Sequence, residues 1–307
     1  MKIVLLDALT FGETSLLALS SLGDVEVHQT TTQEQTASRI TNAEVIVTNK
    51  VVITKELMHN ASKLKLICVA ATGMNNVDLE AAKELGIEVK NVAGYSTDSV
   101  IQHTFSMLFY LIAHSRYYDE VTENKTYSKS GLFTDVSQPF FEVKGKKWGI
   151  IGLGAIGRGV ANIASSFGAE VSYYSTSGVK REEDYKCVAL EELLETCDII
   201  TIHAPLNEQT QNLLDYEQLL TCKDKAVVLN LGRGGIINED AVARIVDEKQ
   251  MSFGLDVFTK EPLVESSPLL SVKNKERLYL TPHIAWTSIE ARDKLIASVA
   301  QNIKDSF

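Results

Sequence analysis

Residues 146–175 read KKWGIIGLGAIGRGVANIASSFGAEVSYYS, which predicts a β-strand, a glycine-rich turn, an α-helix and a second β-strand in that order. The apolar run from Trp148 to Ile151 precedes a G-x-G-x-x-G match formed by Gly152, Gly154 and Gly157, and a helical pattern follows it. Glycine triplets of this form also arise by chance in ordinary turns. The strand before the motif and the helix after it are what favour a dinucleotide-binding unit.

The three glycines of this motif have different physical roles. Gly152 allows a tight turn, Gly154 lets the backbone approach a pyrophosphate, and Gly157 lets the helix pack closely on the strand. The N-terminus of the helix adds unpaired N–H groups and a partial positive charge for the phosphates. We therefore predict that this stretch binds a dinucleotide.

The end of the second strand bears on the choice of cofactor. An acidic side chain is expected there, about twenty residues beyond the motif, to hold the adenine ribose hydroxyls. The strand Glu170 to Tyr174 is instead followed by Ser175, so no carboxylate would repel a 2′-phosphate. Lys180 and Arg181 could attract that phosphate, or they could form an ordinary solvated pair in a loop. The choice between NAD and NADP therefore stays open.

Short aliphatic or β-branched runs alternate with longer amphipathic stretches along the whole chain, a pattern typical of βαβ units around a parallel sheet. Strands are predicted at 2–7, 25–29, 45–48, 64–70 and 88–92, and then at 148–151, 170–174, 198–206, 226–229, 253–255 and 277–280. Helices are predicted at 54–60, 76–85 (with Gly86 as a C-cap) and 158–167. The fold class is therefore α/β.

A longer helix is predicted from Thr97 to Asp119, with Thr97 or Asp98 as its cap. Its apolar residues lie on more than one side, as expected for a helix that is buried between two bodies. The predicted buried face consists of Phe105, Leu108, Leu111 and Ile112. Residues 120–147 are polar, and we interpret them as an arm.

The composition is that of a globular protein with two domains of ordinary size. The 307 residues are 45% hydrophobic and 23% charged, and their net charge is −10. An acidic chain has no long-range attraction for nucleic acid or anionic lipid, so we expect neither as a partner. The N-terminus does not resemble a signal peptide, and the longest apolar run (107–113) is too short to span a membrane, which predicts a cytoplasmic protein.

The cysteines stand far apart, with no C-x-x-C pair and no nearby His at metal-ligand spacing. We expect them to be buried free thiols, as suits a reducing cytosol, and we expect no metal site. They are Cys68, Cys187, Cys197 and Cys222.

Three further strings place an Arg, a Glu and a His just beyond predicted strands. They are NLGRGG with Arg233, DVFTKEP with Glu261 and TPHIAW with His283. Ligands of open α/β sheets gather at the carboxyl ends of strands, so the three side chains can converge where a nicotinamide would lie. Singly, each also has an ordinary interpretation, as a surface charge, a turn residue and a structural histidine.

Together the three residue types suit the reduction of a 2-oxoacid. The planar fork of Arg233 can grip a carboxylate with two parallel hydrogen bonds. His283 can give a proton as a carbonyl becomes a hydroxyl, and a neighbouring Glu261 favours the protonated ring and fixes its orientation. We therefore predict that Arg233, Glu261 and His283 are catalytic.

These motifs resemble those of the D-isomer-specific 2-hydroxyacid dehydrogenase family over essentially the whole chain. The similarity is carried by ATGMNNVDLEAAKELGI (71–87), VAGYSTDSVIQHTFSMLFYL (92–111), GLGAIGRGVA (152–161), ITIHAPLNEQTQNLL (200–214), LNLGRGGIINEDAV (229–242), GLDVFTKEP (254–262) and LTPHIAWTS (280–288). YSTDSVIQHTF and PHIAWTS are most similar to the glycerate dehydrogenase and hydroxypyruvate reductase branch. Ser175 and Asn75 stand where the family usually has Asp.

The resemblance implies hydride transfer between NAD or NADP and a small anionic 2-oxoacid or D-2-hydroxyacid, such as hydroxypyruvate or glyoxylate. It implies cofactor contacts at Thr72, Gly152, Gly154, Ala155, Ile156, Gly157, Ser175, Thr176, Ser177, Ala204, Pro205, Leu231, Gly232, Arg233, Asp256, His283 and Ala285. It implies substrate contacts at Ala71, Thr72, Gly73, Arg233, His283 and Trp286, with Trp286 closing the pocket over a small side chain.

The resemblance also implies two Rossmann-like, doubly wound parallel-sheet domains, one flavodoxin-like and one dinucleotide-binding. Residues 1–98 and 284–307 would form the substrate domain, and residues 99–283 the cofactor domain. Relatives are usually homodimers through the cofactor domain, with the helix at 97–119 and its arm at the contact. A nucleotide-sensing protein like the C-terminal-binding corepressors and a phosphite dehydrogenase-like enzyme remain alternatives. A formate dehydrogenase is disfavoured because Gln would be expected at position 261.

Overall fold

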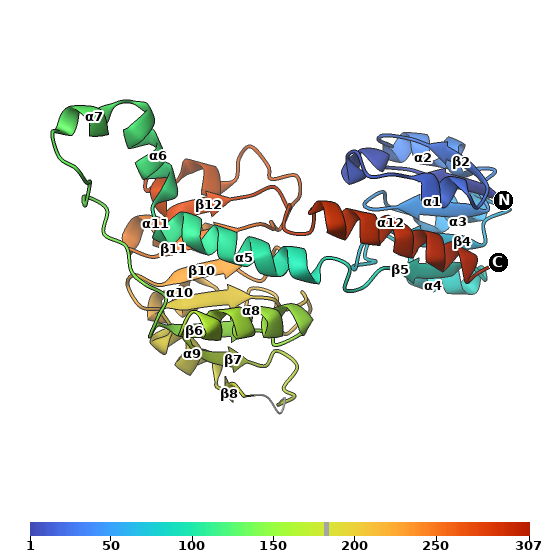
Figure 1. Cartoon of the computed structure of the whole chain (residues 1–307). Helices are drawn as coiled ribbons and strands as arrows, with labels where there is room; N and C mark the ends of the chain where they lie inside the picture. The colour runs from blue at the N-terminus through green and yellow to red at the C-terminus, as the bar shows by residue number, and fades with distance from the viewer. Residues whose placement is uncertain (181–183) are drawn as a thin grey trace. The chain divides into compact units, whose positions relative to one another are not determined.

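The computed structural model describes residues 1–180 and 184–307, and the chain divides into two compact units. Unit 1 comprises Met1–Ser96 together with Trp286–Phe307, and unit 2 comprises Thr97–Ala285. Each unit is built around its own parallel β-sheet (Figure 1). The predicted α/β class with two doubly wound parallel-sheet domains is therefore confirmed.

The sheet of unit 1 has the strand order β2-β1-β3-β4-β5, and all neighbouring strands are parallel. The strands are β1 (Lys2–Leu5), β2 (Asp24–Val27), β3 (Val45–Thr48), β4 (Leu66–Val69) and β5 (Glu88–Asn91), within or next to the predicted runs. The central strands β3 and β4 are buried along their whole length because helices cover both faces of the sheet.

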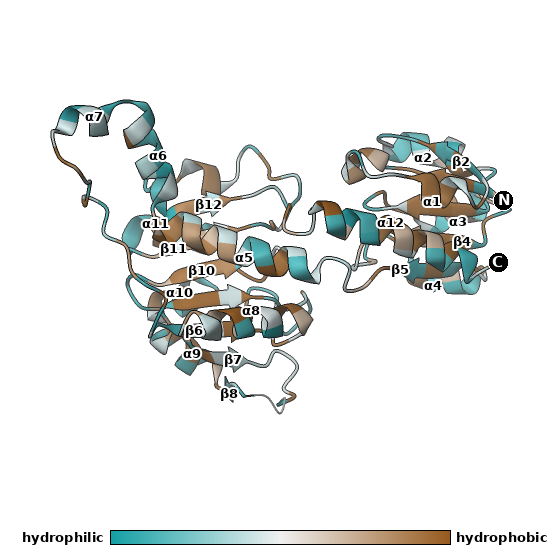
Figure 2. Cartoon of the chain, viewed as in Figure 1, coloured by the Kyte–Doolittle hydropathy of each residue, from teal (hydrophilic) through white to brown (hydrophobic). Residues whose placement is uncertain are grey.

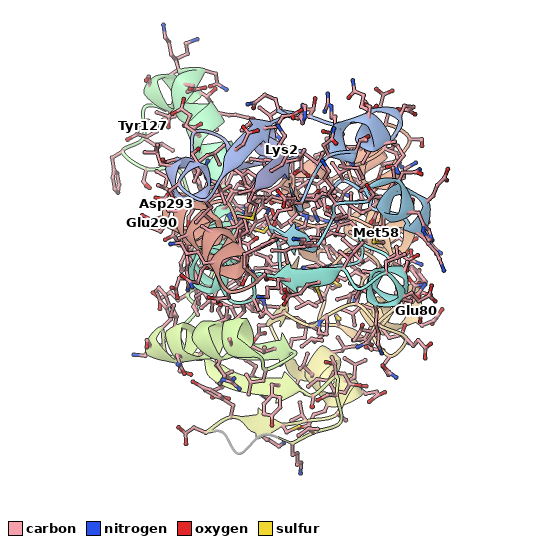
Figure 3. The ribbon with its side chains drawn as sticks, turned by 90° about the vertical axis from the view of Figure 1, so that its right-hand side faces the viewer. Lys2, Met58, Glu80, Tyr127, Glu290 and Asp293 are labelled. Carbon is pink, nitrogen blue, oxygen red and sulfur yellow. The ribbon has the colours of Figure 1, made fainter. Side chains whose placement is uncertain are left out.

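Two groups of helices cover the sheet of unit 1. The short 3₁₀ turn η1 (Ala8–Phe11), α1 (Leu17–Ser20) and α12 (Ile289–Lys304) pack on one face, and α2 (Gln33–Ile40), α3 (Lys55–Asn60) and α4 (Leu79–Glu84) pack on the other. In Figure 3, Glu290 and Asp293 of α12 lie on one side of the sheet, and Met58 and Glu80 lie on the other. The hydropathy colouring of Figure 2 shows the same layering, with apolar strands between helices whose outer surfaces are polar.

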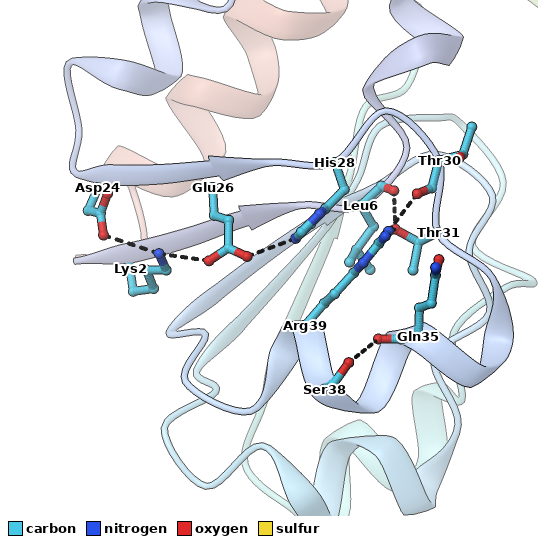
Figure 4. A network of polar contacts seen from close by, with 10 residues as sticks. All are labelled: Lys2, Leu6, Asp24, Glu26, His28, Thr30, Thr31, Gln35, Ser38 and Arg39. Atoms are coloured by element: carbon cyan, nitrogen blue, oxygen red, sulfur yellow. Dashed lines mark hydrogen bonds and ion pairs between the residues drawn. The ribbon is translucent and has the colours of Figure 1, made fainter.

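Charged side chains line the edge of unit 1 where β2 pairs with β1. Lys2 Nζ lies 3.2 Å from Asp24 and 2.8 Å from Glu26, and Glu26 lies 2.9 Å from His28 Nε2 (Figure 4). The hydrogen bond from Lys2 holds the pKa of Glu26 below its ordinary value. Charges on an edge strand discourage pairing with another chain, and exposed pairs of this kind add little to stability.

The sheet of unit 2 has the strand order β12-β11-β10-β9-β6-β7-β8, again with parallel neighbours. Its strands are β6 (Lys147–Ile151), β7 (Glu170–Tyr174), β8 (Lys186–Cys187), β9 (Ile199–Ile202), β10 (Val227–Asn230), β11 (Ser252–Leu255) and β12 (Leu278–Leu280). The strand order reverses between β6 and β9, so the carboxyl ends of these two strands form the switch point where ligands of such sheets bind.

Helices cover both faces of this sheet as well. Helices α5 (Thr97–Ile112) and α8 (Ala155–Ser166) pack on one face, and α9 (Leu190–Thr196), α10 (Tyr216–Thr221) and α11 (Glu239–Glu248) pack on the other. The 3₁₀ turns η2 (Pro268–Ser271) and η3 (Lys275–Arg277) precede β12. The predicted apolar face of α5 is confirmed, since Phe105, Leu108, Leu111 and Ile112 are buried.

The prediction of one continuous helix from Thr97 to Asp119 is wrong. Helix α5 ends at Ile112, and α6 (Ser115–Glu123) begins after His114, whose φ of 48° is left-handed. A residue in this conformation cannot continue a right-handed helix, and the sequence gives no glycine or proline to mark the break. Figure 1 shows α6 and α7 (Thr126–Ser130) extending from the body of unit 2, in the region predicted to be an arm.

The cysteines are free, as expected, but Cys187 is only partly buried. Burial raises the pKa of Cys68 and of Cys222 to about 12, so these thiols stay protonated and unreactive. Within residues 1–180 and 184–307, no helix combines the length and the apolar character that crossing a bilayer requires.

Candidate active site

The glycine-rich turn joins β6 to α8 as the motif predicts. Gly152 has a φ of +93°, which favours glycine, and its N–H donates to Tyr174 O on the neighbouring strand β7. A Cβ on Gly157 would lie 2.3 Å from Gly152 O, so only glycine lets the helix approach the strand this closely. Two of the three glycines are therefore required by the fold itself.

Gly154 is different, because its surroundings are open. A Cβ built on Gly154 meets no atom within 4 Å, and its backbone is extended. Gly154 is the N-cap of α8, and no side chain caps the first N–H groups of that helix. The open space at Gly154 therefore lies at the N-terminus of a 12-residue helix whose first N–H groups have no side-chain cap. Such N–H groups bind anions, so the space fits the pyrophosphate of a dinucleotide.

The end of β7 presents Ser175, whose hydroxyl donates to Val179 O at 2.7 Å and lies 3.5 Å from Ser177 Oγ. The serine hydroxyl thereby closes its own loop, and its oxygen can still accept a hydrogen bond from a ribose hydroxyl. Lys180 is exposed in the same loop. Arg181, the other basic residue expected here, lies outside the described residues.

His203 follows β9 at the switch point, and the motif analysis did not single it out. Its ring nitrogens are both buried and have no hydrogen-bond partner among the described residues. Burial lowers the pKa of His203 to about 3, so the ring is neutral at physiological pH. The backbone N–H of His203 donates to Ile151 O, which ties this residue to the strand before the glycine-rich turn.

The loop after β10 is fixed by Asn230, which is 2% exposed. Its Nδ2 donates to Arg233 O at 2.9 Å, and its Oδ1 accepts from Gly232 N at 3.1 Å. A Cβ on Gly234 would lie 1.9 Å from Phe258 O, so glycine here lets this loop lie directly against the loop after β11. The Arg233 side chain is exposed, and one guanidinium nitrogen donates to Gly232 O at 2.8 Å.

Asp256, directly after β11, holds the loop that carries His283. Its Oδ1 accepts from Ile284 N at 2.8 Å, and its Oδ2 accepts from Ala285 N at 3.0 Å. Thr281 Oγ1 donates to Oδ1 at 2.6 Å, and the Asp256 side chain is 1% exposed. The structure thus gives Asp256 a clear role in shaping the protein, and the cofactor contact implied for it stays a prediction.

His283 and Glu261 meet beyond β12 and β11. His283 Nδ1 lies 2.7 Å from Glu261 Oε2, and the other carboxylate oxygen accepts from Phe258 N at 3.0 Å. The two side chains are 25% and 29% exposed, so they are shielded from water but open to a ligand. His283 has a left-handed φ of 53°, a conformation that costs a non-glycine residue free energy and that is common at functional sites.

The sheet itself brings these parts together. β12, β11, β10, β9 and β6 are successive parallel neighbours, so the loops that follow them lie along one edge. The structure pairs Glu261, which follows β11, with His283, which follows β12. Arg233 follows β10, the neighbour of β11 along that edge. The predicted cofactor residues of unit 2 that follow the same strands are Gly152, Gly154, Ala155, Ile156, Gly157, Ala204, Pro205, Leu231, Gly232, Asp256 and Ala285. Ser175, Thr176 and Ser177 follow β7, which is the neighbour of β6 on its other side.

The predicted site residues of unit 1 lie after β4 and before α12. Ala71 O accepts from Val92 N, Thr72 Oγ1 donates to Val92 O at 3.3 Å, and Thr72 O accepts from Asn91 Nδ2. These bonds fix the loop 71–73, which includes Gly73, at the carboxyl edge of the unit 1 sheet. Trp286 packs edge-on against Tyr95, with ring centroids 6.1 Å apart.

Comparison with known proteins gives this geometry its context. The model of the D-isomer specific 2-hydroxyacid dehydrogenase NAD-binding domain matches residues 105–285, which is more than half of the chain. The chain belongs to this family.

Individual 2-hydroxyacid dehydrogenases are similar along nearly the whole chain. A hydroxypyruvate reductase of Blautia hydrogenotrophica is 33% identical over 99% of this chain and 96% of its own. A glycerate dehydrogenase of Methylorubrum extorquens is 32% identical over 91% of this chain and 87% of its own. The structure of Aquifex aeolicus D-lactate dehydrogenase, complexed with NAD and lactic acid, has a TM-score of 0.84 and 26% identity over 99% of this chain and 94% of its own.

These similarities confirm the predicted family and its glycerate dehydrogenase and hydroxypyruvate reductase branch. The chain is a dehydrogenase that transfers a hydride between a nicotinamide cofactor and a small D-2-hydroxyacid or 2-oxoacid. In the described part of the chain, no three His, Cys, Asp or Glu side chains group as ligands for a metal ion.

Proposed function

We propose that this dehydrogenase reduces hydroxypyruvate or glyoxylate, to D-glycerate or glycolate, with Arg233, Glu261 and His283 as its catalytic residues. The observation that carries the proposal is the 2.7 Å contact between His283 and Glu261. This contact lies at the carboxyl edge of the sheet, and the G-x-G-x-x-G turn follows another strand at the same edge. The names of the hydroxypyruvate reductase and glycerate dehydrogenase relatives support the choice of substrate.

Arg233 binds the substrate in this proposal. Its guanidinium grips the carboxylate with two parallel hydrogen bonds and also polarises the ketone oxygen. The clamp of Asn230 on the loop 232–233 holds the arginine backbone in place, so the backbone of this loop loses little freedom on binding. In unit 1, the N–H groups of the loop 71–73 are the proposed donors for the substrate.

His283 is the acid in reduction and the base in oxidation. Because Nδ1 is held by Glu261, Nε2 is the nitrogen that exchanges a proton with the substrate oxygen. The Glu261 carboxylate holds Nδ1 and so keeps the ring from rotating. When bound, the reduced nicotinamide supplies the hydride that adds to the carbonyl carbon of the substrate.

The unit 2 residues fit the cofactor as follows. The turn 152–157 and the N-terminus of α8 hold the pyrophosphate, and the run Ser175 to Ser177 meets the adenine ribose. The backbone at Ala204, Pro205, Leu231 and Gly232 lines the path toward the nicotinamide. Without a carboxylate after β7, NADP is accepted as well as NAD. In this proposal unit 2 (Thr97–Ala285) corresponds to the predicted cofactor domain at 99–283, and unit 1 is the substrate domain, with Trp286 over the small substrate side chain.

A steady-state assay tests the proposal. Oxidation of NADH and of NADPH is followed at 340 nm with hydroxypyruvate, glyoxylate, pyruvate and a branched 2-oxoacid. Hydroxypyruvate or glyoxylate is expected to give the highest kcat/KM. A clear preference for the branched acid would contradict the substrate assignment, and no turnover with any of the acids would favour a nucleotide-sensing role.

We also propose a homodimer through unit 2. Tyr110 and Tyr279 stack at 4.0 Å between centroids and line a groove of about 530 Å³ that extends along α5, α6 and residues 269–280. The arm of the same unit exposes large apolar side chains, among them Phe133 (92%) and Val136 (80%). In the proposed isologous contact, the exposed apolar side chains of the arm and this groove belong to the face that the two copies share.

Sedimentation analysis tests this assembly. The wild-type chain is expected to sediment as a dimer, and Phe133→Asp with Val136→Asp is expected to yield monomers. Leu17→Asp is the matched control, because Leu17 is an exposed apolar residue (78%) of unit 1, and it should leave the dimer intact. A wild-type monomer would overturn the assembly without touching the proposed reaction.

A further inference from the structure

Next to the His283 loop, three polar side chains form a row. His103 belongs to α5, Thr281 follows β12 and Asp256 follows β11. His103, on α5, has its Nε2 3.3 Å from Thr281 Oγ1 and 3.7 Å from Asp256 Oδ1. The His103 side chain is 15% exposed and that of Asp256 only 1%, so the row is largely shielded from water. None of the motifs in the sequence assigns a role to His103 or to Thr281.

The direction of these hydrogen bonds follows from counting protons. The single hydroxyl proton of Thr281 is donated to Asp256 at 2.6 Å, so Thr281 can only accept from His103. His103 is therefore the donor, through Nε2–H. Burial lowers the pKa of His103 although Asp256 acts in the opposite sense, which agrees with a neutral ring that carries its proton on Nε2.

The row ends on the two residues that follow His283. Asp256 accepts from Ile284 N and Ala285 N, so the orientation of its carboxylate sets the path of the chain just after the proposed acid. Helix α5 holds the same loop at a second point, where Ser99 Oγ donates to Ala285 O at 2.6 Å. Ser99 and His103 are four residues apart and so lie on one face of the helix.

We infer that His103 is a positioning residue for proton transfer by His283, acting through the hydroxyl of Thr281 and the carboxylate of Asp256. The inference rests on the proposed function, in which His283 is the acid. His283 has a left-handed backbone that isolated residues rarely adopt, so it must be held by its surroundings. A small displacement of an acid from its productive position lowers the rate of the chemical step more than it weakens substrate binding.

Three variants of the full-length enzyme test the inference. His103→Leu removes the donor, Thr281→Val breaks the row at its centre, and His103→Gln restores an N–H near the position of Nε2. We expect His103→Leu and Thr281→Val to lower kcat about tenfold with KM changed less than about twofold, and His103→Gln to recover most of kcat. The double variant His103→Leu/Thr281→Val should lose no more than either single variant, because both break one row.

Controls separate this role from a loss of folding. His59→Leu changes an exposed histidine of unit 1 and should behave as wild type. Melting temperatures and NADH affinity, from cofactor fluorescence, are measured for every variant. If His103→Gln loses as much kcat as His103→Leu, the residue acts through packing and the inference is overturned.

His283→Asn is measured in parallel. If His103→Leu turns over like the wild type while His283→Asn is inactive, the inference on His103 is overturned and the proposed function stands. Wild-type turnover in His283→Asn overturns the proposed function and the inference with it.

Discussion

His283 Nδ1 and Glu261 Oε2 lie 2.7 Å apart, although the two residues belong to loops that follow different strands. In the proposed reaction, this contact leaves Nε2 as the ring nitrogen that acts on the substrate and places the Glu261 carboxylate beside the ring. The same Glu261 carboxylate accepts from Phe258 N, so its own position is fixed by the backbone. The pair is thus oriented by the protein itself, as the proposed proton transfer requires.

His283→Asn should lower kcat for oxoacid reduction by about 10²- to 10⁴-fold, with a much smaller change in KM, because the acid is lost while Arg233 still binds the carboxylate. Glu261→Gln should cause a smaller loss, because the acid remains but the carboxylate that orients its ring is gone. Steady-state kinetics with a saturating cofactor check both. A His283→Asn enzyme with near-normal turnover would refute the assignment.

Arg233→Lys should raise KM about 10²-fold or more with a smaller effect on kcat, because lysine keeps the charge but cannot form two parallel hydrogen bonds. Arg244→Ala, which removes a positive charge from the surface of α11, is the control and should leave KM unchanged. Steady-state kinetics with a saturating cofactor measure the effect. Equal KM values for wild type and Arg233→Lys would remove Arg233 from the substrate site.

Gly154→Val should weaken NADH binding about tenfold or more without lowering the melting temperature. A Cβ there meets no protein atom within 4 Å, and the valine side chain would occupy the space assigned to the pyrophosphate. Gly157→Val should instead destabilise the fold, since its Cβ would lie 2.3 Å from Gly152 O. Cofactor fluorescence titration and thermal melting separate the two outcomes, and unchanged NADH affinity in Gly154→Val would place the pyrophosphate elsewhere.

The sequence predicted the sheets and the edge that carries the site because local patterns determine them. Short apolar runs bounded by turn residues, such as Trp148 to Ile151 before Gly152, predict buried strands, and the residues that follow a parallel strand lie at its carboxyl edge. Arg233, Glu261 and His283 were found in this way. The confirmed part is the placement of these residues after neighbouring strands, and their chemical roles stay predictions.

What the sequence could not predict depends on contacts between distant residues. The break of the long helix at His114 carries no local signal, since His is neither glycine nor proline. Similarly, His103 looks like an ordinary polar residue on a mostly apolar helix, and only the packing of α5 brings its Nε2 to Thr281. The clamp formed by Asn230 was only weakly indicated by the sequence, which shows an amide at the start of a glycine-rich loop. That this amide is buried is known from the structure alone.

Ser175→Asp should shift cofactor preference toward NADH. A carboxylate at the end of β7 would accept from both ribose hydroxyls and repel a 2′-phosphate. The ratio of kcat/KM for NADH to that for NADPH should rise about tenfold, equivalent to about 1.4 kcal/mol. Thr176→Asp places the carboxylate one residue further along the loop and tests whether the change in cofactor preference depends on its position. An unchanged ratio in Ser175→Asp would mean that the adenine ribose does not lie at this strand end.

His203 should make unit 2 sensitive to acid. Burial lowers the pKa of His203 from 6.5 to about 3, so between these values the unfolded chain binds a proton that the folded chain excludes. The contribution of His203 to the free energy of unfolding is therefore fully present above pH 6.5. It decreases by about 1.4 kcal/mol per pH unit as the pH falls toward 3. From pH 7 to pH 5 the wild type should lose about 2 kcal/mol more than a His203→Leu variant.

Trp148 makes this loss measurable in unit 2 alone. The chain has two tryptophans, and only Trp148, which is fully buried, belongs to unit 2. In a Trp286→Phe background, urea unfolding followed by tryptophan fluorescence therefore reports unit 2. His59→Leu, which changes an exposed histidine of unit 1, should leave the pH dependence as in the parent. Parallel losses in the parent and in His203→Leu would mean that the buried ring takes up its proton without unfolding, against the neutral state argued for it.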